Sequence, residues 1–184
     1  MKHLSSSLLC VVLASVPRFA EALHLGGDVA VQGGYSTAIP LGAGSVGVHG
    51  GGIMAEGGLR IAAHFLGIRG AFQQLYRDSD TDYPHQAMAF SLRYSYTWAF
   101  LGERITLTTG VGLGVGAYSG CLLGDYCGGG GFEWNASVSV GYRVLPWFSI
   151  ELVNDFAFQG GMVNGVDVVM MYSPMAALRV SLGR

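Results

Sequence analysis

Charge is what this sequence has least of. Only 12% of its 184 residues are charged while 51% are hydrophobic, and the mean hydropathy is +0.41. Soluble domains carry about a quarter of their residues as charges. The single lysine is Lys2, the net charge is −2, and there is no basic cluster. These absences exclude a nucleic-acid-binding surface and point away from an ordinary soluble domain.

Beyond the amino terminus the sequence also lacks the long apolar runs expected of membrane helices. The stretch ITLTTGVGLGVGAY (105–118) is uncharged, but every second residue in its middle is glycine. Each glycine inside a helix costs about 1 kcal/mol relative to alanine, so a helix is disfavoured. Its alternation of apolar with small or polar residues predicts a strand. Such a strand suits a half-buried sheet or a barrel in lipid.

The one apolar run at the amino terminus has the pattern of a processing signal. MKH provides a basic start, LSSSLLCVVLASV is too short to span a bilayer, and Ala20-Glu21-Ala22 is a small-x-small cleavage pattern. We therefore expect a signal peptide over 1–22 and one domain over 23–184. A first strand or an anchor helix is the alternative, because Arg18 lies inside the cleavage region.

Cysteine is scarce. Removal of the signal leaves Cys121 and Cys127, six positions apart in SGCLLGDYCGGGG. In an exported protein such a pair predicts a disulfide that closes a small loop, with two free thiols as the alternative. A metal site is not expected, because no neighbouring His or second Cys pair supplies further ligands.

Alternating extended segments fill the rest of the chain. Three connections are short, at Leu66-Gly67, 101–104 and 145–147, and they alternate with four long ones. This alternation predicts an all-β fold: an eight-stranded antiparallel up-and-down transmembrane β-barrel with short periplasmic turns and longer extracellular loops. The predicted strands are 24–36, 52–65, 68–77, 85–100, 105–118, 132–144, 148–160 and 168–183.

The predicted hairpins keep one face of the sheet apolar. Around the three short turns, the outward pairs are Phe65 with Ile68, Phe100 with Ile105, and Val144 with Phe148. Aromatic residues gather in two girdles, as in membrane barrels. A soluble, lipocalin-like barrel would instead place its charges outside. The short-turn girdle comprises Phe65, Trp98, Phe100, Trp147 and Phe148, and the loop-end girdle comprises Tyr35, Tyr76, Phe132, Trp134, Phe158 and Tyr172.

The opposite face collects charges of both signs. Five acids and five bases there are expected to pair inside the barrel, because unpaired charges in a narrow interior are costly. Across one hairpin Gly112 lies opposite Arg93, so the glycines of 105–118 leave room for long arginines. The predicted interior charges are Asp28, Glu56, Arg60, Arg69, Arg93, Glu133, Arg143, Glu151, Asp155 and Arg179.

With these features the sequence resembles the small eight-stranded bacterial outer-membrane proteins of the OmpA transmembrane domain and OmpX class. The resemblance covers nearly all of 23–184 and rests on architecture rather than on a diagnostic motif. It implies an outer-membrane location, contact with outer-membrane lipid and lipopolysaccharide, insertion by the barrel-assembly machinery, and a monomer. The chain departs from the class at its end, ALRVSLGR, which lacks the usual terminal aromatic residue.

Catalytic and cation-binding patterns are weak. His24, His49, His64 and His85 belong to no HExxH motif or serine elbow. The barrel resembles lipid A deacylases of the PagL type in size but lacks their closely spaced His and Ser. Asp78, Asp80 and Asp82 in DSDTDYP suggest either a weak cation site or a solvated acidic loop.

We therefore expect a non-enzymatic barrel without cofactor or metal, plugged by its charges. Its expected role is structural, envelope-stabilising or surface-binding. A narrow OmpW-like channel for small hydrophobic molecules and a lipid A-modifying enzyme are the alternatives.

Overall fold

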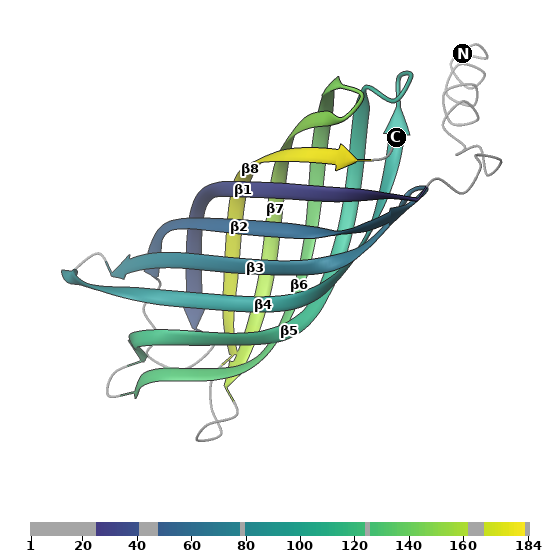
Figure 1. Cartoon of the computed structure of the whole chain (residues 1–184). Coiled ribbons are helices and arrows are strands. Elements are labelled where there is room, and N and C mark those ends of the chain that lie inside the picture. Colours follow the sequence, from purple (N-terminus) through teal and green to yellow (C-terminus); the bar gives the residue numbers. More distant parts are fainter. Residues whose placement is uncertain (1–24, 41–47, 78–79, 124–125, 162–167, 183–184) are drawn as a thin grey trace, which may run out of the picture.

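The computed structural model describes residues 25–40, 48–77, 80–123, 126–161 and 168–182, which form a closed barrel (Figure 1). All neighbouring strands are antiparallel, and β8 pairs with β1 to close the sheet. The predicted fold class is confirmed. No helix within these ranges is long and apolar enough to cross a membrane. The strands are β1 (Leu25–Pro40), β2 (Val48–Ile61), β3 (His64–Arg77), β4 (Asp80–Phe100), β5 (Ile105–Leu123), β6 (Tyr126–Leu145), β7 (Phe148–Gly161) and β8 (Val168–Leu182).

The two-residue period of the strands separates an apolar outer face from a polar inner face. On β5, Leu113 is 54% exposed and points outward, whereas Thr106 and Thr108 are buried inside. Arg93 of β4 lies opposite Gly112 of β5, as predicted. Large apolar side chains are exposed on all eight strands, among them Leu92 and Leu152 at 65% and 67%. The barrel therefore has its apolar surface outside.

The two ends of the barrel differ. Short connections at 62–63, 101–104 and 146–147 share one end with Leu25 and Leu182, the described ends of the chain (Figure 1). At the other end β4, β5 and β6 run for 21, 19 and 20 residues. A strand needs only about 9–11 residues to span a bilayer, so these three extend well beyond that length.

This extension corrects two predicted loops. Cys121 and Cys127 lie on β5 and β6 as backbone partners, not in a loop between shorter strands. Asp80 and Asp82 belong to β4, whose pairing with β3 continues to Arg77 opposite Asp80. Asp78 is outside the described residues. Strand pairing persists here because consecutive backbone groups continue to find partners across the hairpin.

The first predicted turn is wrong. The chain turns at Ala62 and Ala63, with Ala62 at φ 52°, rather than at Leu66-Gly67. This earlier turn places Phe65 inside the barrel, fully buried, and removes it from the short-turn girdle. Gly67 is needed within β3 for packing, because a Cβ there would lie 2.4 Å from the Gly57 carbonyl oxygen.

The other two short hairpins are closer to prediction. Phe100 pairs with Ile105, as expected. In the hairpin of β6 and β7, however, Phe148 pairs with Leu145 and not with Val144, because the register shifts between Arg143 and Leu145. Both Val144 and Leu145 remain exposed, so the outer face stays apolar through this irregularity.

Candidate functional site

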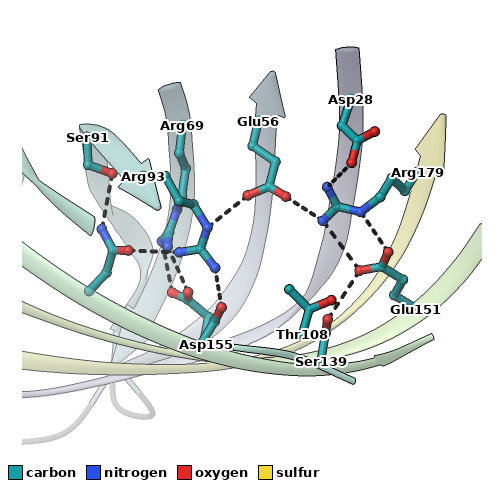
Figure 2. Close-up of polar contacts among 12 residues, drawn as sticks. Asp28, Glu56, Arg69, Ser91, Arg93, Thr108, Ser139, Glu151, Asp155 and Arg179 are labelled. Atoms are coloured by element: carbon teal, nitrogen blue, oxygen red, sulfur yellow. Dashed lines mark hydrogen bonds and ion pairs between the residues drawn. The ribbon is translucent and has the colours of Figure 1, made fainter. Parts of the chain in front are cut away.

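The candidate site is the network of charged side chains inside the barrel (Figure 2). Alternation along the strands directs these residues inward, where nine of the ten predicted interior charges are buried: Asp28, Glu56, Arg60, Arg69, Arg93, Glu133, Glu151, Asp155 and Arg179. Arg143 differs. It lies near the short turns and forms an ion pair at 2.5 Å with Glu103, whose side chain is 52% exposed.

Arg179 of β8 is the centre of one part of the network. Its Nε lies 2.6 Å from Glu151 Oε1, its Nη2 lies 2.5 Å from Glu56 Oε1, and its Nη1 lies 3.6 Å from Asp28 Oδ2. Arg60 donates to the same Asp28 oxygen from Nε at 2.5 Å and also pairs with it through Nη2. One guanidinium thus links carboxylates from β1, β2 and β7 and ties the closing strand to the rest of the barrel.

Arg93 extends the network from β4. Its Nε lies 2.9 Å from Glu56 Oε2, so Glu56 bridges Arg93 and Arg179 (Figure 2). Its Nη1 donates to Asn135 Oδ1 at 2.9 Å, and its Nη2 donates to the Ser137 hydroxyl. The carboxylate partner that the sequence left open for Arg93 is therefore Glu56.

Arg69 and Asp155 form a separate two-pronged pair across the barrel. Arg69 Nη1 and Nη2 donate to the two Asp155 oxygens at 2.7 and 2.8 Å. Such bidentate pairs combine charge with fixed geometry. The Arg69–Asp155 pair joins β3 to β7, which are not neighbours in the sheet, so this contact crosses the interior.

Glu133 has a different environment. It is fully buried, and no described Arg is close enough to form an ion pair with it. Instead Asn135 Nδ2 and Gln159 Nε2 each donate to one of its oxygens at 2.8 Å. All five predicted acids are therefore buried inside the barrel but only four of the five predicted bases, because Arg143 lies at the barrel end. Sequence reasoning missed Asn135 and Gln159, which give no charge signal.

Glycines on β5 provide the space that this network occupies. A Cβ at Gly110 would lie 2.7 Å from Arg93 Nη2, and one at Gly112 would lie 2.5 Å from Asn135 Oδ1. Any larger side chain would displace the guanidinium or its amide partner. The glycine pattern of 105–118 is therefore a packing requirement of the charged interior.

The rest of the interior is filled. Towards the loop end it contains an apolar cluster of Ala38, Val48, Leu75, Ala87, Ala157, Val169 and Met171, with the buried His85 beside it. Small cavities remain in the packing, among them one of about 10 Å³ beside Glu133 and Arg69 and one of about 20 Å³ at the short-turn end beside Arg60 and Arg143. Each has room for roughly one water molecule. An eight-stranded barrel is narrow enough for side chains to fill in this way.

The described histidines do not come together. His64 is exposed on β3, where its Nδ1 shares a hydrogen bond of 2.8 Å with the Tyr94 hydroxyl. His49 stacks on Tyr35 outside, whereas His85 is buried within the barrel. His24 is outside the described residues. Among the described residues, no three His, Cys, Asp or Glu side chains are grouped to hold a metal ion.

Comparison with solved structures identifies the fold. Neisserial surface protein A (NspA) superposes with a TM-score of 0.63 at 15% identity, over 83% of this chain and 96% of that chain. Ail, the attachment invasion locus protein of Yersinia pestis, superposes with a TM-score of 0.44 at 15% identity, and the outer membrane enzyme PagL with a TM-score of 0.47 at 16% identity. Each match covers 83% of this chain and 98% of the matched protein. The TM-scores of Ail and PagL are below 0.5, so these two structures match this barrel only loosely. No family model and no curated protein sequence matches the chain. The chain therefore has the fold of small outer-membrane β-barrel proteins.

Proposed function

We propose that this chain is a bacterial outer-membrane β-barrel with a structural, envelope-stabilising or surface-binding role. The observation that carries the proposal is the polarity of the sheet: large apolar side chains are exposed around the barrel, whereas nine charged side chains are buried inside. Exposing that apolar outer surface to water would be unfavourable, whereas contact with lipid hydrocarbon would be favourable. The partners we propose are outer-membrane lipid, lipopolysaccharide and the barrel-assembly machinery.

The extended end of β4, β5 and β6 gives this role a surface. These strands are five to seven residues longer than the 14-residue β2, β3 and β7. With the short turns in the periplasm, the extra length projects outward from the cell. The barrel then acts as a membrane anchor for this projecting end.

Fractionation tests the location. The mature protein should be recovered in the outer membrane and should migrate faster on gels before heating than after it, as closed barrels do. Recovery in the soluble fraction, with no change in mobility on heating, would refute the proposal.

A plugged interior implies no steady ion conduction. The ion pairs of Arg69 with Asp155 and of Arg179 with Glu56 lie within the lumen and obstruct it. In planar bilayers the purified barrel should show no sustained open state. A stable conductance would show that the ion pairs do not close the interior.

One observation favours a second candidate, a narrow path for small hydrophobic molecules. The loop-end half of the interior contains an apolar cluster that includes Leu75, Val169 and Met171. Binding of a fluorescent apolar probe, lost in a Val169→Asp variant and retained in a surface variant such as Met88→Leu, would support this path. Absence of catalysis is part of the main proposal, and mass analysis of lipid A with and without the protein tests it.

A further inference from the structure

Two buried polar atoms near Glu133 have no hydrogen-bond partner among the described residues. Arg69 uses Nη1 and Nη2 to bind Asp155, but its Nε donates to none of these residues (Figure 2). Gln73 donates from Nε2 to the Ser173 hydroxyl at 3.1 Å, and its Oε1 accepts from none of them. Both side chains are buried, at 3% exposure, so bulk solvent does not reach these atoms. Buried polar atoms in folded proteins nearly always have a partner, which is either protein or ordered water.

The two atoms belong to side chains that line one cavity. The two-residue period of β3 directs Arg69, Ala71 and Gln73 to the inner face. Ala71 is small and separates two long side chains. The cavity of about 10 Å³ adjoins these three residues and Glu133 of β6. A hydrogen-bond donor, an acceptor and a carboxylate thus border one small volume.

Size and charge decide what this cavity suits. Its volume is about that of one water-sized probe, so a larger molecule does not fit. A metal cation has no lone pair to accept the Arg69 Nε–H and would lie beside a positive guanidinium. An anion would lie beside Glu133, which is held by amides and not by a cation. A water molecule is neutral, and it both accepts and donates, so it matches Arg69 Nε and Gln73 Oε1 together.

We propose that the barrel binds one internal water molecule, which accepts a hydrogen bond from Arg69 Nε and donates one to Gln73 Oε1. Its second hydrogen has an acceptor in Glu133, because each Glu133 oxygen accepts one amide hydrogen bond and a carboxylate oxygen can accept two. The water links Arg69, and through it Asp155, to this carboxylate. The inference rests on the barrel fold and not on the proposed membrane location.

Nuclear magnetic resonance of the ¹⁵N-labelled full chain, refolded in detergent micelles, tests the site through the Arg69 Nε–H proton. This proton should receive magnetisation directly from water, with the sign expected of a water molecule that is held in the protein. The matched control is the Arg179 Nε–H, which donates to Glu151 at 2.6 Å and should receive none. The two guanidinium groups carry the same exchangeable protons, so transfer by proton exchange would affect both.

Three substitutions locate the water. Ala71→Val keeps Arg69 and Gln73 but fills space between them, so it should abolish the Arg69 signal. Gln73→Leu removes the acceptor with little change in volume and should remove most of the signal. Gln74→Leu is the control, because Gln74 is the next residue on β3, faces outward and bonds to Tyr76. It should leave the Arg69 signal unchanged.

Heat-modifiable mobility of each variant shows whether its barrel has closed, and Gln73→Leu decides alone if Ala71→Val does not fold. In the folded parent, no transfer to the Arg69 Nε–H, or equal transfer to Arg69 and Arg179, would refute the internal water. A signal that survives both Ala71→Val and Gln73→Leu would refute its position. Failure of the proposed function would appear separately, as protein absent from the outer membrane, and would not alter this measurement in micelles.

Discussion

Removing Arg179 should destabilise the barrel more than any exposed charge change. Its guanidinium contacts Glu56, Glu151 and Asp28, but two of these keep another cation in an Arg179→Met variant. Asp28 retains Arg60, and Glu56 retains Arg93 at 2.9 Å. Glu151 would keep only the hydroxyls of Ser139 and Ser149, at 3.2 and 3.3 Å. One carboxylate with a 3% exposed side chain is thereby left without a counter-charge.

Leaving one buried charge unpaired costs about 3–5 kcal/mol, so the free energy of unfolding should fall by that amount in Arg179→Met. Replacing the stranded carboxylate as well, in Arg179→Met with Glu151→Gln, should recover a large part of the loss. The coupling between the two changes should reach about 2–3 kcal/mol, as for other contacting residues. Reversible urea unfolding in lipid vesicles, followed by tryptophan fluorescence and by gel mobility, measures these values.

The Arg143–Glu103 pair provides a control of similar geometry but different exposure. Its atoms lie 2.5 Å apart, yet the Glu103 side chain is 52% exposed. Glu103→Gln should therefore cost only about 0–1 kcal/mol. If Arg179→Met costs no more than Glu103→Gln, or if the double variant is no better than Arg179→Met alone, the buried network does not hold the closing strand as we argue.

Three further predictions concern facing, packing and the cysteines. Leu113→Arg places a charge on the lipid face and should reduce the stability of the inserted barrel by about 2–4 kcal/mol, measured by folding into vesicles. If this variant folds as well as the parent, the lipid-facing and interior faces of the sheet are reversed. Gly114→Ala should cost about 1–3 kcal/mol, because its Cβ would lie 2.0 Å from the Phe90 carbonyl oxygen. Gly70→Ala, which meets nothing within 4 Å, should be near neutral in the same assay, and equal effects would contradict the packing argument. Mature protein should contain a disulfide between Cys121 and Cys127, so that reduction shifts its gel mobility. The double serine variant should still fold, because the hydrogen-bonded ladder between the strands closes the barrel without the disulfide. Two alkylatable thiols in envelope-purified protein would contradict the disulfide.

The sequence alone determined which residues face outward over most of the chain. A period of two requires no knowledge of distant contacts, so the exposed Leu113 and the buried Arg93 could be assigned from local alternation. The same rule failed around residues 62–67, where the chain turns at Ala62 and not at the more obvious Gly67. Phe65 then belongs to the next strand and points inward. A turn without glycine gives no local signal, and a glycine needed for close packing gives a misleading one.

Only the tertiary structure decided which charges meet. Arg69 reaches Asp155, 86 positions away, and Arg179 reaches Glu56, 123 positions away. These pairs depend on how far each strand is staggered when the barrel closes, a property of the whole sheet that no single hairpin contains. For the same reason the contacts by which the Asn135 and Gln159 amides hold Glu133 could not be predicted from the sequence. Local alternation fixes the face of a side chain, but closure of the barrel fixes its partner.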